Sequence, residues 1–398
     1  MMNELRTSSC QPRAHRTCGR TGHAQLVRGA GRAGLGLAVA GALAVSFAVT
    51  PAGASTRPFL GGLSTVSRIA STVPASGPAA GDQNPYGTGV VPRTLGDLVR
   101  GDVLVSNFND AGNAQGTGAS IMEISPAGGV RQFAVVRQPT ATPAVGLTTA
   151  LVALRSGYVI VGSLPAPGGQ AGAARAGALT VLNSRGRVVE TFKGGAINGP
   201  WDLGAVDAGT HVTLFVTNVL NATVATNGAT VDGGTVVRLT LQIAGDHPPR
   251  LTSERVIATG LAEHTDPNAL IVGPTGVALG SGDVLYVADT AANRITAIPN
   301  ALTRTQLIDR GRTLSKGGKL NSPLGLTIAP NGDVLTVNAG DGNIVETAVS
   351  GKQIAVKTLV PNGAGDLFGV ARTPTGTGVY FVNDSGSGTA SNTLELLH

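Results

Sequence analysis

Charged, cysteine and aromatic side chains are scarce in this sequence. Of its 398 residues, 13% are charged, 3% are aromatic and 2 are cysteines, whereas 42% are hydrophobic. Disordered chains combine few apolar residues with many charges, so this composition excludes a disordered tail protein and provides enough apolar residues for a core. The 58 glycines and 22 prolines follow no Gly-X-Y period. They indicate many turns, which are typical of all-β folds.

The first 54 residues have the pattern of an export signal. Six arginines and one acidic residue, Glu4, precede a run of small and apolar residues from 34 to 49, and small residues then lead to Ala54. We interpret 1–54 as a signal peptide that is cleaved after Ala54. The apolar run has about 16 residues, whereas a membrane-spanning helix needs about 20. No later run is longer, so we expect a secreted or extracytoplasmic protein whose mature chain has no membrane span.

Without this leader, the chain has almost no net charge. The net charge of the whole chain is +6, but residues 55–398 keep 23 basic and 22 acidic residues, a net charge of +1. A nucleic-acid-binding protein needs a basic surface, so the mature chain is not expected to bind nucleic acid. Cys10 and Cys18 leave with the leader. The mature chain therefore has no disulfide and no Cys-ligated metal.

A short apolar segment recurs six times along the mature chain. Each copy contains a valine followed within two residues by a small or polar residue, and successive valines are 45 to 71 residues apart. The polar residues at these segment ends are Asn107, Ser163, Asn218, Asp289, Asn338 and Asp384. A repeat of this length indicates a modular fold made of one supersecondary unit per copy.

Each copy has a Gly-containing apolar segment before it and one or two strand-like segments after it. This arrangement predicts four antiparallel strands per unit, and therefore an all-β, six-bladed β-propeller over residues 83–398. The last unit ends at His398 after its third strand. We predict that residues 64–74, within an N-terminal segment 55–82, supply its outer strand and close the ring.

The fourth repeat carries a family resemblance. Residues 274–278 read Pro-Thr-Gly-Val-Ala, 285–289 read Leu-Tyr-Val-Ala-Asp and 293–295 read Asn-Arg-Ile. This pattern resembles that of NHL-repeat six-bladed β-propellers, and residues 323–348 match it more loosely. The resemblance implies a propeller that binds a ligand or a protein partner, and some relatives are enzymes. We therefore expect an extracytoplasmic binding or scaffold module with an unidentified envelope or extracellular partner, acting as a monomer without a cofactor.

Propeller ligands bind where the loops that enter the innermost strands converge. The residues expected at this channel mouth are Tyr86, Val145, Trp201 with its neighbour Asp202, Thr275, Leu324 and Phe368. Trp201 is the single tryptophan, and aromatic rings offer a face for stacking a sugar or a cation. Two interpretations remain open: the rings form a ligand platform, or they pack against one another and plug the channel.

The alternative function is a hydrolase, lactonase or lyase with its site at the same mouth. A calcium-dependent lactonase resembling gluconolactonase and regucalcin needs several oxygen ligands, and this ring offers only Asp202, so we expect no metal. His264, beside Glu263, is the best general-base candidate among the histidines. For the polar ring of Asn107, Asn218, Asp289, Asn338 and Asp384 we favour a structural role, because Asn and Asp side chains bond nearby backbone groups in turns.

Overall fold

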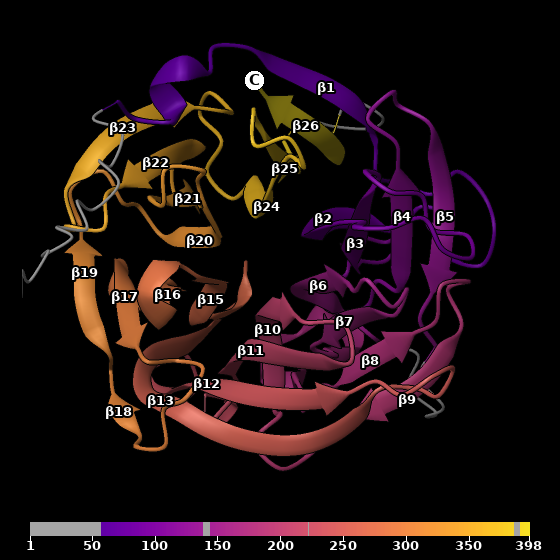
Figure 1. Cartoon of the computed structure of the whole chain (residues 1–398), viewed down its shortest axis with the longest axis horizontal. Helices are drawn as coiled ribbons and strands as arrows, with labels where there is room; N and C mark the ends of the chain where they lie inside the picture. The colour runs from indigo at the N-terminus through magenta and orange to yellow at the C-terminus, as the bar shows by residue number, and fades with distance from the viewer. Residues whose placement is uncertain (1–56, 138–143, 222, 386–390) are drawn as a thin grey trace, which may run out of the picture. The chain divides into compact units, whose positions relative to one another are not determined.

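The computed structural model describes residues 57–137, 144–221, 223–385 and 391–398, which fold almost entirely into β-sheet. Six separate sheets surround a central axis (Figure 1). The prediction of an all-β, six-bladed propeller is therefore confirmed. The expected signal peptide, 1–54, lies outside the described residues. Within the described ranges, no helix is long and apolar enough to cross a membrane.

The first three blades each begin with an innermost strand and continue outward in chain order. Blade 1 comprises β2 (Gln83–Val90), β3 (Val103–Asn109), β4 (Ser120–Ile124) and β5 (Val130–Val135). Blade 2 comprises β6 (Leu147–Ala153), β7 (Val159–Ser163), β8 (Leu179–Leu182) and β9 (Val188–Phe192). Blade 3 comprises β10 (Gly199–Asp207), β11 (His211–Val219), β12 (Val231–Gln242) and β13 (Arg250–Asp266), with the short β14 (Leu270–Val272) added.

The last three blades also run outward in chain order, except that the outermost strand of blade 6 comes from the N-terminal segment. Blade 4 comprises β15 (Pro274–Leu279), β16 (Val284–Asp289), β17 (Arg294–Pro299) and β19 (Arg312–Lys316). Blade 5 comprises β20 (Pro323–Ile328), β21 (Val334–Asn338), β22 (Asn343–Thr347) and β23 (Gln353–Thr358). Blade 6 comprises β24 (Leu367–Arg372), β25 (Val379–Asn383) and β26 (Thr393–Leu397), with β1 (Val66–Ser71) outermost.

The connections between strands carry the remaining short elements. β18 (Ile308–Asp309), in the β17–β19 connection, pairs in parallel with β13 and so joins blade 4 to the outer edge of blade 3. Six 3-10 turns are η1 (Leu60–Gly62), η2 (Pro167–Gly169), η3 (Ala171–Ala173), η4 (Val224–Thr226), η5 (Ser281–Asp283) and η6 (Thr290–Ala292).

Burial follows from the packing of blade on blade. All residues of β3, β7, β21 and β25 are buried, whereas the outermost strands β1, β9 and β23 are largely exposed or half-buried. A sheet that is covered on both faces needs no polar-apolar alternation, which explains the continuous apolar runs of the second strands.

The N-terminal segment packs against the last two blades. β1 pairs antiparallel with β26, from Val66 opposite Leu397 to Ser71 opposite Thr393. Just before it, the backbone N–H groups of Phe59 and Leu60 donate to the two carboxylate oxygens of Glu346 in blade 5, each at 2.8 Å. The segment therefore contacts both of the last two blades.

Glycines allow the six innermost strands to approach one another around the axis. These strands contact in the order β2, β6, β10, β15, β20, β24 and back to β2 (Figure 1). A Cβ on Gly325 would overlap the carbonyl oxygen of Phe368 in the next blade, and a Cβ on Gly369 would overlap that of Tyr86. We call this level of the channel the waist; Gly87 and Gly276 occupy it in two other blades.

Candidate functional site

Four aromatic side chains meet at the channel, immediately above the waist. Tyr86 stacks between Phe108 and Phe368, with ring centroids 4.3 and 4.2 Å away. Trp201 meets Tyr86 and Phe108 edge-on, each at 5.9 Å. Tyr86 and Trp201 are both 2% exposed. Because both faces of the Tyr86 ring are covered, this ring cannot stack on a sugar, and the cluster packs as a plug.

A cavity of about 440 Å³ lies against this cluster and is called the mouth cavity below. Five of the residues expected at the channel mouth line it: Tyr86, Trp201, Thr275, Leu324 and Phe368. Its other polar lining residues are Asn84, Asn109, Asn113, Gln115, Asp266, Asn268, Thr290, Ser322 and Asp384. No lysine, arginine or histidine of the described chain lines it. The plug is therefore also the apolar part of the wall of a polar cavity.

Two of the expected positions lie elsewhere. The inner strand of blade 2 begins at Leu147, which pairs with Ser163, so Val145 precedes the strand and packs in the core between blades 1 and 2. Thr148 occupies the corresponding place, because its carbonyl faces Gly87 as the Phe368 carbonyl faces Gly325. Asp202 lies at the waist and lines a second cavity, which shares no lining residue with the mouth cavity.

Several lining side chains have hydrogen-bonding capacity that the described residues do not use. Asn84 Oδ1, Asn109 Oδ1, Gln115 Oε1 and Trp201 Nε1 are buried, and none has a partner in the described part of the chain. A buried polar atom without a partner costs about 1–3 kcal/mol. Such atoms normally bond to ordered water, an ion or a ligand.

Connections between strands of different blades meet at the mouth cavity. Gln115, in the β3–β4 connection, donates through Nε2 to the carbonyl of Asn268, in the connection between β13 and β14, at 2.6 Å. The N–H of Ala166, in the β7–β8 connection, donates to the carbonyl of Gly116 at 3.0 Å. Blade 5 contributes the small residues Ala339 and Gly340 to the lining.

Asp384 is the carboxyl group of the mouth cavity with a perturbed pKa. Burial, followed by the charge of Asp366, raises the pKa of Asp384 to about 7. Burial and the charge of Asp384 also raise the pKa of the Tyr86 hydroxyl, which stays neutral at physiological pH. Asp384 can therefore exchange a proton near neutral pH.

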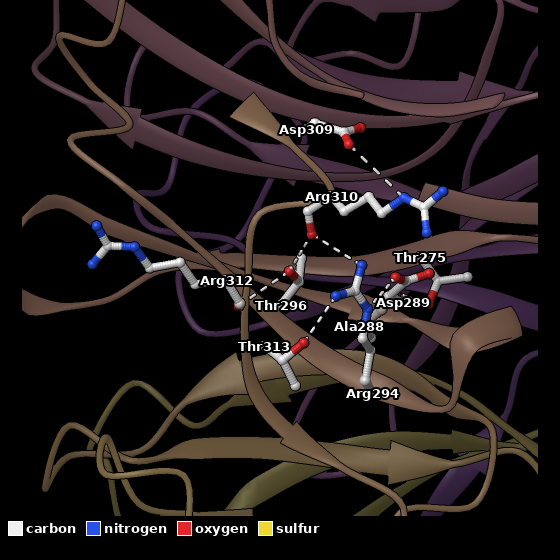
Figure 2. Close-up of polar contacts among 9 residues, drawn as sticks. All are labelled: Thr275, Ala288, Asp289, Arg294, Thr296, Asp309, Arg310, Arg312 and Thr313. Carbon is white, nitrogen blue, oxygen red and sulfur yellow. Dashed lines mark hydrogen bonds and ion pairs between the residues drawn. The ribbon is translucent and has the colours of Figure 1, made fainter. Parts of the chain in front are cut away.

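Asp289, another member of the polar ring, belongs to an ion-pair network in blade 4 (Figure 2). Arg294 Nε donates to Asp289 Oδ2 at 2.7 Å. The same guanidinium donates to Thr313 Oγ1 and to the carbonyl of Arg310, both at 2.9 Å, and Thr296 Oγ1 donates to that carbonyl at 2.8 Å. Asp289 therefore holds β16, β17 and β19 together and does not line the mouth cavity.

The asparagines of the polar ring make similar structural contacts. Asn107 donates through Nδ2 to the carbonyl of Thr72 at 2.8 Å, and Asn218 Oδ1 accepts from the N–H of Asn198 at 3.0 Å. Asn338 donates to a backbone carbonyl at 2.8 Å. All three are fully buried. Their contacts are those of a structural role, and of the polar ring only Asp384 lines the mouth cavity.

Catalytic side chains are few at this site. Among the described residues, no group of three or more His, Cys, Asp or Glu side chains is arranged to hold a metal ion. His264, expected as a general-base candidate, does not line the mouth cavity. Its neighbour Glu263 is fully buried, and its Oε1 accepts from the Asn221 N–H and from Thr223 Oγ1, both at 2.9 Å. The carboxyl group of Glu263 thus anchors the β11–β12 connection.

Several residues of the cavity wall were not predicted from the sequence. Asn84 and Asn109 lie two residues from predicted positions, so the repeat register contained a signal for them. Phe108 follows a predicted polar position on β3. Gln115 and Asn268 belong to loops that are 153 residues apart in the chain, and no periodic pattern predicts their contact.

Comparisons with known proteins identify the fold. No family model and no curated protein sequence matches this chain. Among solved structures, a luciferin-regenerating enzyme is 12% identical with a TM-score of 0.52, and the alignment covers 84% of this chain and 93% of that one. Regucalcin from Agrobacterium tumefaciens, described as a calcium-binding protein, is 11% identical with a TM-score of 0.51, covering 83% and 93%. A gluconolactonase from Xanthomonas campestris is 13% identical with a TM-score of 0.50, covering 86% and 98%.

These identities are low, so the likeness shows a shared fold and not a shared activity. The similar structures belong to six-bladed propellers. The likeness therefore supports the propeller fold alone, and the resemblance to the NHL-repeat group stays a prediction.

Proposed function

We propose that the protein binds a small, uncharged, hydroxyl-bearing molecule in the mouth cavity. One observation carries the proposal: Asn84, Asn109, Gln115 and Trp201 all line one cavity, and each has a buried polar atom without a partner among the described residues. A volume of about 440 Å³ lies within the usual range for small-molecule sites. Hydroxyl groups both donate and accept, and so match three acceptor oxygens and one indole N–H.

The charge of the lining favours a neutral ligand over an anion. Among the described residues, two carboxyl groups line the cavity, those of Asp266 and Asp384, and no basic side chain does. These carboxyl groups would repel an anion when ionised. The aromatic cluster supplies an apolar patch for the hydrocarbon face of the ligand, through Trp201 and Phe368.

Titration with sugars and polyols tests the proposal. Trp201 is the single tryptophan and lines the cavity, so its fluorescence reports occupancy directly. We expect a saturable fluorescence change with at least one neutral polyol, and about fivefold or greater weakening in Asn109→Ala. Gln306→Ala, an exposed position in the β17–β18 connection, is the matched control. Fluorescence that responds equally to sugar acids, or that Asn109→Ala leaves unchanged, would contradict the assignment.

A hydrolase is the second candidate, and Asp384 is the observation that favours it. A general base works best when its pKa lies near the operating pH, and Asp384 has a pKa of about 7 at the wall of the cavity. The gluconolactonase of similar fold makes sugar lactones the first substrates to assay. Lactone hydrolysis that rises as pH increases through 7 and disappears in Asp384→Asn would support an enzyme. Hydrolysis at the uncatalysed rate would contradict the hydrolase candidate and leave binding as the one proposed function.

Export is proposed from the sequence. The basic and apolar residues before Ala54 direct secretion, and cleavage there leaves a mature chain that begins at Ser55. N-terminal sequencing of the protein from the culture medium and from cells tests this proposal. A protein that keeps residues 1–54 and stays in the cytoplasm would refute it.

A further inference from the structure

A second cavity, of about 540 Å³, lies on the other side of the waist. All six innermost strands line it with the residues that follow their waist positions. Half-buried aliphatic side chains contribute to its wall beside polar side chains and strand backbone: Val90, Val152, Val206, Leu279 and Ile328. Such a wall favours a hydrocarbon ligand group.

One carboxyl group, that of Asp202, lies at the inner end of this aliphatic cavity. Asp202 occupies the waist position at which Gly87, Gly276, Gly325 and Gly369 stand in four other blades. The fold therefore does not need a carboxyl group here, since glycine meets the steric requirement of the waist. The carboxyl is a departure from the repeat that points to a local role.

The carboxyl group of Asp202 has no cationic partner in the described part of the chain. No ion pair within the described ranges includes Asp202, and its Oδ1 accepts the backbone N–H of Leu203 at 2.8 Å. Burial raises its pKa well above the usual range, although the backbone N–H groups of Leu203 and Val277 oppose that shift. A cation beside the carboxyl would stabilise its charged form.

The other charged residue of the wall lies at the outer end. Arg372 is the last residue of β24 and is exposed. It is three residues beyond Gly369, and at about 3.3 Å per residue that places its backbone about 10 Å outward from the waist. The cavity therefore has a carboxyl group at its inner end and a guanidinium group at its rim, with aliphatic side chains between them.

We propose that this second cavity binds an amphipathic ammonium ion, with the ammonium group on Asp202 and the hydrocarbon body against the aliphatic wall. The volume is within the range of small-molecule sites. Ammonium donates up to three hydrogen bonds, and its bond to a carboxylate is charge-assisted and short. This site is separate from the mouth cavity and does not depend on its ligand.

A purely structural role for Asp202 is the alternative. Its carboxyl lies between β10 and β15 and accepts backbone N–H groups from both, so it would tie blade 3 to blade 4. Asp202→Asn separates the two roles, because asparagine keeps an acceptor oxygen for these N–H groups and loses only the charge. Asp207→Asn, on the same strand but outside the cavity, is the matched control for loss of a charge.

Isothermal titration of the full mature protein with 2-phenylethylammonium, 2-phenylethanol and 3-phenylpropanoate tests the proposal. We expect the ammonium ion to bind at least about tenfold more tightly than the alcohol, and the anion to bind most weakly. Asp202→Asn should abolish the preference for the ammonium ion, while Asp207→Asn keeps it. Thr327→Phe, which fills the cavity without altering Asp202, should weaken both ammonium and alcohol.

Three outcomes would overturn the assignment. They are equal affinities of ammonium ion and alcohol, an ammonium preference that survives Asp202→Asn, and no binding of either at millimolar concentration. A drop of more than a few degrees in the melting temperature of Asp202→Asn with unchanged ammonium affinity would show that the carboxyl is a structural tie only.

Discussion

Removing residues 57–75 tests how the ring is closed. This segment contains η1 and β1, which contact blades 5 and 6. Leu60 is 0% exposed and Leu63 6% exposed, within a core cluster shared with blade 5 and blade 6 residues. Without the segment, both leucine sites become empty, Glu346 loses two N–H donors and β26 becomes an edge strand.

The magnitude follows from burial. Each fully buried leucine contributes about 1.5–3 kcal/mol, so the pair contributes about 3–6 kcal/mol. Unfolding entropy is about 2.1 cal/mol/K per residue, or about 0.7 kcal/mol/K for roughly 340 residues. The truncated protein should therefore melt about 4–9 °C below the chain that begins at residue 57. The new edge strand should also promote aggregation.

Scanning calorimetry of the two chains measures this difference. Leu60→Ala in the longer chain should cost about 2–5 kcal/mol, because it leaves a cavity in the core. Leu302→Ala is the matched control, since that leucine is 38% exposed and should change stability by no more than about 0.5 kcal/mol. A truncated chain with the melting temperature of the longer one would refute the reasoning that the segment closes the ring.

Three further predictions concern single side chains. Burial raises the pKa of Glu263 to about 7 from a usual 4.5, so the contribution of this group to stability is full below about pH 4.5 and falls by about 3 kcal/mol as pH rises to 7. Between pH 5 and pH 8, urea unfolding should show a loss about 2–3 kcal/mol smaller in Glu263→Gln than in the native protein; equal losses in both would disprove it. Gly325→Ala should cost about 1–3 kcal/mol in the same assay because its Cβ overlaps a carbonyl of the next blade, whereas Gly172→Ala, with open space around it, should cost less than 1 kcal/mol. Tyr86→Phe keeps both ring contacts and should cost less than about 1.5 kcal/mol, against about 3–5 kcal/mol for Tyr86→Ala; similar costs would exclude stacking as the source of stability.

The repeat positions were predictable because they depend on local pattern. Val105 and Val287 lie within β3 and β16, and the polar residues that follow them end up buried near the channel. In blade 2, Leu147 pairs with Ser163 as Pro85 pairs with Asn107 in blade 1, so Gly146 precedes the strand and does not mark the waist. A glycine in the sequence indicates that an unusual backbone conformation is possible at that position. The pairing of strands determines which level of the channel the glycine occupies.

Side-chain directions and contacts between loops could not be predicted from the sequence. Asp202 follows Trp201 directly, yet the two residues line different cavities, because β10 crosses the waist at this point. The Gln115–Asn268 contact and the β18–β13 pairing join segments from different blades. Their sequences carry no period, so only the assembled ring brings them together.

Departures from the repeat, rather than the repeat itself, distinguish one blade from another at the channel. Six equal blades would present six equal waist residues, and four of them do present glycine, whereas blade 3 presents a carboxyl group. At the mouth, the β3–β4 connection of blade 1 contributes Asn113 and Gln115 to the wall, while the turn of blade 5 after Asn338 is short and contributes Gly340. The side chains that make this propeller specific are those that break its internal symmetry, because the symmetric positions are already used by the packing of blade against blade.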